Sequence, residues 1–158
     1  MKATLKATAL ILLTLAGSAW AMPVNEALGQ IETGADVPEQ CAADFSRGPA
    51  GEVSRYQFLP SVWHAYGGGD PTDPAQAWAV ASRVIRDRSA AFECVTHRQP
   101  TPREIYVLWT APGQFAQRDY DWQRLSPRVR ARSQRFANLI EVRRPHKIDS
   151  EKAGQNPT

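Results

Sequence analysis

Apolar residues recur at helical spacing in five segments of the chain, and helix-breaking residues separate these segments. The first segment runs from Pro23 to Glu32, with Asn25 as its expected cap and Thr33-Gly34 as its end. Each of the other four has a proline in its first turn, where proline favours a helix start. Because no segment shows the alternation typical of a strand, the predicted fold is mainly α. We expect these four helices over residues 60–66, 73–94, 101–111 and 126–141.

The segment from Ala35 to Leu59 has no regular pattern and contains several glycines and prolines. About 25 residues without regular structure are uncommon in a compact domain unless they have a function, and a groove-lining loop pinned by a disulfide would supply one. Cys41 and Cys94 are the two cysteines of the chain, and in an exported protein we expect them to be bonded. The alternative is two buried thiols. A zinc site is not indicated, because the histidines and cysteines lack ligand spacing.

The N-terminus has the pattern of a secretory signal peptide over residues 1–21. Two lysines precede an apolar run, and the small-x-small pattern Ala-Trp-Ala follows. Cleavage after Ala21 leaves 158 − 21 = 137 residues, which we divide into one domain (22–141) and a polar tail (142–158). We expect a periplasmic or secreted protein without a membrane span, since no other stretch approaches roughly 20 apolar residues. Removal of two lysines leaves a net charge of 17 − 16 = +1, which does not support nucleic-acid binding.

Carboxylates are the side chains best placed to carry chemistry. The chain lacks a phosphate-binding glycine loop and a nucleophilic-serine elbow, and its cysteines are expected to be bonded. Glu32 ends an apolar helical segment, where poor hydration favours the protonated form of a carboxyl group. A protonated carboxyl can donate to a leaving oxygen, so Glu32 is the candidate general acid. The alternative is an ordinary solvated carboxylate at a helix end.

Two further segments interleave aromatic side chains with amide, hydroxyl and charged groups. One covers residues 51–63 and the other covers residues 106–113. Aromatic rings pack on the apolar faces of sugars, and amides hydrogen-bond to hydroxyl and acetamido groups. Both segments are therefore candidates for a sugar-binding groove. The alternative is that their aromatic residues belong to the core.

Three motifs follow one another along the chain. Glu32-Thr33 is an acid followed by a small hydroxyl residue. Residues 54–57, Ser-Arg-Tyr-Gln, come next, and residues 106–113 end in an aromatic-rich block before a glycine. In this order and spacing the chain resembles the lysozyme-like soluble lytic transglycosylase family. Ser54 stands where that family usually has glycine, and Thr110 stands where many members have asparagine.

The resemblance implies a lysozyme-like single domain of the goose-type class, with the long loop lining its groove. It implies peptidoglycan as substrate, cut between N-acetylmuramic acid and N-acetylglucosamine. Glu32 would act first as acid and then as base, leaving a 1,6-anhydro end. No metal or organic cofactor is implied. The residues implied in substrate binding are Thr33, Ser54, Tyr56, Gln57, Tyr106, Trp109 and Thr110.

Two alternatives remain open. A muramidase on the same scaffold would activate water with a second carboxylate, for which Glu52 is the first candidate, followed by Asp44 and Asp70. A non-catalytic periplasmic module would instead bind glycan or dock onto an envelope assembly, such as a secretion, pilus or conjugation machine. The last helix has a basic stripe that would serve such docking. Arginines in such a stripe are, however, more often simply exposed to solvent. Its residues are Arg128, Arg130, Arg132 and Arg135.

Overall fold

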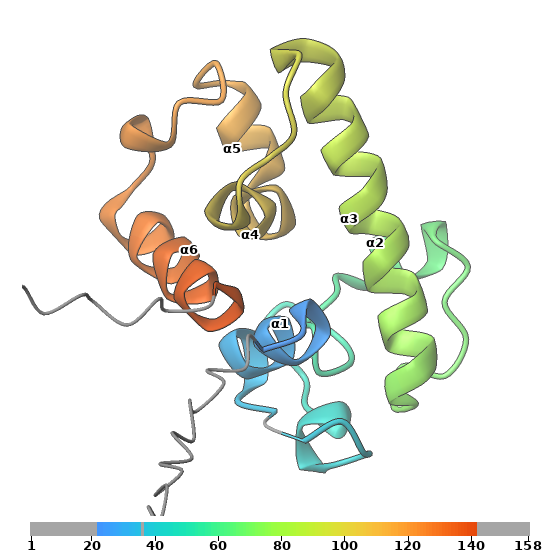
Figure 1. The fold of residues 1–158 in the computed structure, drawn as a ribbon. Coiled ribbons are helices and arrows are strands. Elements are labelled where there is room, and N and C mark those ends of the chain that lie inside the picture. The colour runs from blue at the N-terminus through green and yellow to red at the C-terminus, as the bar shows by residue number, and fades with distance from the viewer. Residues whose placement is uncertain (1–21, 36, 142–158) are drawn as a thin grey trace, which may run out of the picture.

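The computed structural model describes residues 22–35 and 37–141, and this part of the chain is mainly helical, as predicted (Figure 1). The predicted signal peptide and polar tail lie outside the described residues. No helix within the described ranges is long and apolar enough to cross a membrane. The elements are α1 (Val24–Thr33), η1 (Ala42–Phe45), α2 (Pro60–Ala65), α3 (Pro74–Thr96), α4 (Pro102–Thr110), α5 (Pro112–Ala116), η2 (Trp122–Arg124) and α6 (Pro127–Ile140), where η marks a 3-10 helix.

Capping residues produce most of the helix starts that the sequence predicted. The Asp73 carboxylate accepts hydrogen bonds from two backbone N–H groups in the first turn of α3. Thr101 and Glu104 form a reciprocal capping box at the start of α4. The predicted cap of α1 is wrong, because Pro23 precedes the first turn and no side chain caps it. Asn25 lies one residue inside the helix, past the position from which a side chain can reach the free N–H groups.

The five predicted helices are all present, and their ends differ from the prediction by at most two residues. Three short elements, η1, α5 and η2, were not predicted. Pro112 was expected only to end a helix, yet it also begins α5. Helices of three to five residues are too short to show an apolar period, so the pattern of the sequence does not reveal them.

Helix α4 lies at the centre of the fold. Figure 1 shows it end-on between α3, α5 and α6, and it packs against all three. Tyr106, Val107 and Leu108 are at most 3 % exposed, although consecutive residues of a helix point in different directions. α4 is therefore buried on several sides. The larger apolar cluster joins its Tyr106 face to α1, α2, α3 and α6, and the smaller one joins its Val107 face to α5.

A buried ion pair orders the long segment between α1 and α2. The Asp44 side chain, in η1, is 0 % exposed, and Arg55 donates to it through Nε and Nη2, each at 2.6 Å. Arg55 also donates to the backbone carbonyls of Val37 and Glu39, at 2.8 and 2.6 Å. One guanidinium therefore connects three parts of the segment, and its fixed fork of donors gives the segment a defined shape.

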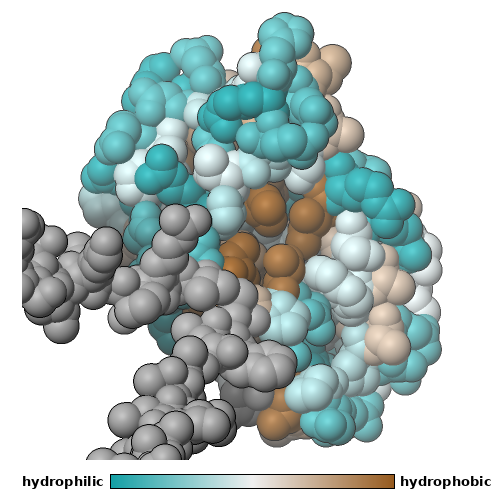
Figure 2. All heavy atoms as spheres, viewed as in Figure 1, coloured by the Kyte–Doolittle hydropathy of each residue, from teal (hydrophilic) through white to brown (hydrophobic). Residues whose placement is uncertain are grey.

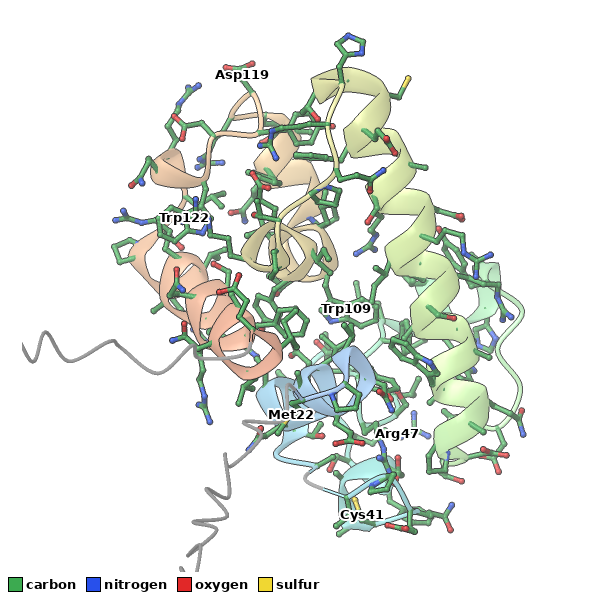
Figure 3. All side chains as sticks on the ribbon, in the orientation of Figure 1. Met22, Cys41, Arg47, Trp109, Asp119 and Trp122 are labelled. Atoms are coloured by element: carbon green, nitrogen blue, oxygen red, sulfur yellow. The ribbon has the colours of Figure 1, made fainter. Side chains whose placement is uncertain are left out.

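The predicted disulfide is wrong, because Cys41 and Cys94 are both free thiols. Cys41 lies beside the start of α3, since the neighbouring Gln40 donates to the Thr72 carbonyl just before that helix. Cys94 lies near the other end of this 23-residue helix. Twenty residues of helix span about 30 Å, and a disulfide bridges Cα atoms only up to about 7 Å apart. Figure 3 accordingly shows Cys41 at the opposite end of the molecule from the C-terminal end of α3.

Candidate active site

Glu32 lies in the last turn of α1, where side chains from two other helices hold its carboxylate. The hydroxyl of Tyr106, in α4, donates to Oε1 at 2.8 Å. Arg132, in α6, donates from Nη2 to Oε2 at 3.0 Å and to the backbone carbonyl of Ile31 at 3.1 Å. The Glu32 side chain is only 10 % exposed. Groups separated from it by 74 and 100 positions in the sequence thus fix one carboxylate.

Tyr106 acts as a firm hydrogen-bond donor in this arrangement. Its ring is fully buried and packs against Phe136, with ring centroids 5.5 Å apart. Burial raises the pKa of the Tyr106 phenol far above its usual range, and the neighbouring Glu32 carboxylate raises it further. The hydroxyl therefore keeps its proton around neutral pH. The Arg132 guanidinium lies over the same ring, 5.6 Å from its centroid, so the three groups pack as one unit.

The surroundings of Glu32 differ from those that the sequence suggested. Helix α1 does bury apolar residues, Ala27 and Leu28, as expected. The carboxyl group itself, however, meets a hydroxyl and a guanidinium, so it is not enclosed by apolar groups alone. The guanidinium belongs to Arg132, which the sequence assigned to a docking stripe or a solvated face. The resting carboxylate is therefore ion-paired.

Glu32 lines a pocket of about 560 Å³ formed by segments far apart in the sequence. α1, the long loop, α2, α3, α4 and α6 all contribute to it, together with the start of α5. Part of the lining is apolar, and Figure 2 shows apolar residues gathered at the centre of the visible face, surrounded by hydrophilic ones. Five of the residues predicted to form the site line this pocket: Glu32, Glu52, Gln57, Trp109 and Thr110.

A glycine shapes the part of the pocket that the long loop provides. Gly48 lies so close to Glu52 Oε2 and Gln57 Oε1 that an added Cβ would collide with both. Glu52 accepts a hydrogen bond from the backbone N–H of Ala50 at 2.8 Å, and Gln57 donates its amide to the Ser54 carbonyl at 3.1 Å. Gln57 also has a φ of +54°, which is uncommon for a residue with a side chain. The loop thus holds a carboxyl and an amide around the same glycine.

Trp109 and Thr110 form the part of the pocket at the end of α4. The Trp109 ring packs edge-on against Phe58, with centroids 4.9 Å apart. Figure 3 shows Trp109 near the centre of the molecule, between α4, α3 and α1. Thr110 is the last residue of α4 and is exposed. Arg88, from α3, donates to the carbonyls of Leu108 and Trp109 at 2.8 and 2.6 Å, so a cation satisfies the negative end of this helix.

Four of the predicted substrate-binding residues do not line the pocket: Thr33, Ser54, Tyr56 and Tyr106, the last of which is fully buried and donates to Glu32. Ser54 and Tyr56 are 1 % and 2 % exposed, so neither is accessible to a ligand. The Ser54 hydroxyl accepts a hydrogen bond from the Tyr56 backbone N–H at 3.1 Å, and burial raises the pKa of Tyr56 to about 12. Thr33 donates to the backbone carbonyl of Arg55 at 3.0 Å and so ties the end of α1 to the turn before Gln57. None of these four residues is therefore placed to contact a ligand in the pocket, although Thr33 holds the end of α1 and Tyr106 holds the Glu32 carboxylate.

The three candidates for a second carboxylate have different environments. Glu52 lines the pocket. Asp44 is fully engaged by Arg55 in the interior, away from the pocket. Asp70 accepts hydrogen bonds from the backbone N–H and the hydroxyl of Thr72, at 2.9 and 2.8 Å, in the exposed turn before α3. Glu52 is therefore the candidate that can share a ligand with Glu32.

Three arginines of the pocket were not predicted as site residues. Arg88 comes from α3, and Arg128 and Arg132 come from α6. The spacing of four residues between Arg128 and Arg132 places them on one face of a helix, and this was the available signal. Nothing local in the sequence indicates that this face meets Glu32, so the stripe could not be distinguished from a solvated surface.

No family model, curated protein or solved structure matches the chain. Within residues 22–35 and 37–141, no group of three or more His, Cys, Asp or Glu side chains is arranged to hold a metal ion. The arrangement around Glu32 is therefore the basis on which a function can be argued.

Proposed function

We propose that the protein is a lytic transglycosylase that cleaves the glycan strands of peptidoglycan, with Glu32 as its acid and base. The observation that carries the proposal is a nearly buried carboxylate, held by Tyr106 and Arg132, at the wall of a pocket of about 560 Å³. Gln57 and Trp109 line the same pocket, and their amide and aromatic groups suit a sugar with acetamido substituents. A lysozyme-like arrangement of the helices belongs to the same proposal.

The proposed reaction breaks one bond and forms another without consuming water. Glu32 donates a proton to the oxygen between N-acetylmuramic acid and N-acetylglucosamine, and the bond from C1 to that oxygen breaks. The acetamido oxygen of the same sugar stabilises the positive charge at C1, as in substrate-assisted glycosidases. The ionised Glu32 then accepts the proton of the muramic 6-hydroxyl, whose oxygen bonds to C1. The product has a 1,6-anhydro end, and the carboxyl group has recovered its proton.

Arg132 has to release Glu32 before the first step of this reaction. A carboxylate paired with a guanidinium has no proton to donate, and Arg132 occupies Oε2 in the resting structure. The Arg132 side chain is 35 % exposed and can turn towards solvent, whereas Tyr106 is buried and stays on Oε1. We propose that entry of the glycan separates the pair. Oε2 then takes up a proton from solvent and becomes the donor oxygen, while Tyr106 keeps the carboxyl group in orientation.

The test is to incubate the purified protein with peptidoglycan sacculi and to identify the soluble products by mass spectrometry. We expect 1,6-anhydro ends. Glu32→Gln should lose at least about 100-fold in rate, because general acid–base catalysis contributes about that much or more, while binding to sacculi remains. Glu26→Gln makes the same change on the same helix outside the pocket, and it should keep its activity. Equal rates in the wild type and Glu32→Gln would remove Glu32 from the mechanism.

A muramidase is the second candidate, because Glu52 lines the same pocket as Glu32. In that reaction the second carboxylate activates a water molecule that attacks C1. The same experiment separates the two reactions, since hydrolysis leaves reducing ends instead of anhydro ends. If Glu52 is the residue that activates the water molecule, Glu52→Gln should lose this hydrolysis. Binding of sacculi without any cleavage would instead indicate a glycan-binding module.

A further inference from the structure

The pocket carries more positive than negative side chains. Arg88, Arg128 and Arg132 line it, together with the two carboxylates Glu32 and Glu52. Arg132 is paired with Glu32, at 3.0 Å. Elsewhere in the described ranges, no carboxylate lies within ion-pair distance of Arg88 or Arg128. Two guanidinium groups thus meet the pocket without an ion-pair partner.

Arg88 is held in place before any ligand arrives. Its Nη1 donates to the two carbonyls at the end of α4, at 2.8 and 2.6 Å, and this uses only part of its five-donor fork. Burial lowers the pKa of Arg88, but an arginine side chain remains protonated in proteins. Because the side chain is already ordered, binding of a ligand to its remaining N–H groups costs little conformational entropy at Arg88.

Arg128 adds an exposed charge to the ordered charge of Arg88. It lies in the first turn of α6 and is exposed, and this end of the 14-residue helix carries the positive part of the helix dipole. Arg88 and Arg128 come from different helices, and Thr110 lines the pocket with them. The pocket therefore offers two guanidinium groups and a hydroxyl group, all of which can donate hydrogen bonds to an anion.

We propose that Arg88 and Arg128 form a subsite for a carboxylate attached to the glycan, so that the pocket selects muramic acid over neutral sugars. This inference rests on the proposed function and names the part of the substrate that the site recognises. Arginine forks bind carboxylates through paired, charge-assisted hydrogen bonds. In peptidoglycan such a carboxylate is the 3-O-lactyl group of N-acetylmuramic acid where the stem peptide is absent, or an acidic group of the stem where it is present. Neutral chitin fragments carry neither.

The test is direct binding of short sugars that lack the scissile bond, so that cleavage does not interfere. Three ligands are compared by calorimetry or NMR titration: the disaccharide N-acetylglucosaminyl-N-acetylmuramic acid, the same disaccharide with a stem peptide, and neutral N,N′-diacetylchitobiose. We expect at least one charged ligand to bind about 10-fold tighter than chitobiose, since a hydrogen bond to a charged group is worth roughly that factor. The preference should shrink as salt is added.

Arg128→Gln should remove most of this preference and leave chitobiose binding unchanged. Arg128 is exposed, so the substitution does not disturb the core, and Arg135→Gln is the matched control on an exposed position of α6 outside the pocket. Which charged disaccharide binds tighter identifies whether the carboxylate is that of the lactyl group or of the stem. Equal binding of all three sugars, unaffected by Arg128→Gln, would overturn the subsite and leave the proposed function standing. Failure to bind any of them, together with intact sacculi, would overturn both.

Discussion

Replacing Asp44 by asparagine should destabilise the protein strongly, although it changes only one atom of the side chain. Both carboxylate oxygens of Asp44 are in use: Arg55 donates to each at 2.6 Å, and the backbone N–H of Cys41 donates to Oδ2 at 2.8 Å. The Asp44 and Arg55 side chains are 0 % and 5 % exposed. Asparagine would turn an amide towards a guanidinium that has no other carboxylate nearby. The buried positive charge would then be unpaired.

The size of the effect follows from this burial. Removing one partner of a buried ion pair typically costs about 3–5 kcal/mol, because the remaining charge loses its compensation. Arg55 keeps the carbonyls of Val37 and Glu39, which favours the lower end of that range. We therefore expect Asp44→Asn to lower the free energy of unfolding by about 3 kcal/mol. For a domain of this size, that corresponds to a melting temperature about 10 °C lower.

Urea unfolding followed by tryptophan fluorescence measures this difference. The matched control is Asp119→Asn, because Asp119 pairs with Arg124 at 2.8 Å but the two side chains are 86 % and 54 % exposed. An exposed pair contributes roughly 0–1 kcal/mol, so the control should unfold close to the wild type. If Asp44→Asn were as stable as Asp119→Asn, the buried pair would not be what orders the long loop, and the role given to Arg55 would be wrong.

Two further predictions concern acid stability and the free thiols. Burial by itself raises the pKa of Glu104, but hydrogen bonds from Arg98 and Thr101 outweigh it and lower the pKa to about 2, from 4.5. This lowered pKa stabilises the protein fully above pH 4.5, and the stabilisation is lost as the pH falls towards 2. Because the Arg98 side chain is half-exposed, we expect the free energy of unfolding to fall by about 2 kcal/mol over this range. Urea unfolding at a series of pH values measures the fall, and Glu104→Gln should show little of it. Because Cys41 and Cys94 are not bonded, a reductant should leave the melting temperature unchanged, and a marked drop would indicate a bridge between them.

The helices could be predicted because their signals are local. A cap such as Asp73, a capping box such as Thr101 with Glu104, and a proline in the first turn all act within a few residues of each other. The elements that were not predicted lack such local signals. η1, α5 and η2 are too short for an apolar period, and the path of the long loop depends on Arg55 meeting Asp44, eleven positions away.

The candidate site likewise contains residues that the sequence identified correctly and residues that it did not. Glu32 could be singled out as a carboxyl at the end of an apolar helix, and Gln57, Trp109 and Thr110 were named from their motifs; the pocket indeed brings these four together. Ser54 was named from the same motif as Gln57, yet the turn that brings Gln57 to the pocket buries Ser54. Residues that are close together in a motif can have side chains that point in different directions.

The sequence by itself determined where the helices lie, which carboxylate is the candidate acid, and which amide and aromatic residues accompany it, since these depend on residue type and short spacing. Only the tertiary structure decided that Arg132 and Tyr106 hold that carboxylate and that three arginines share its pocket. It also decided that the cysteines lie at opposite ends of α3 and remain free. These contacts join residues many turns of chain apart, and their distances are set by how the helices pack around α4, which no local pattern encodes.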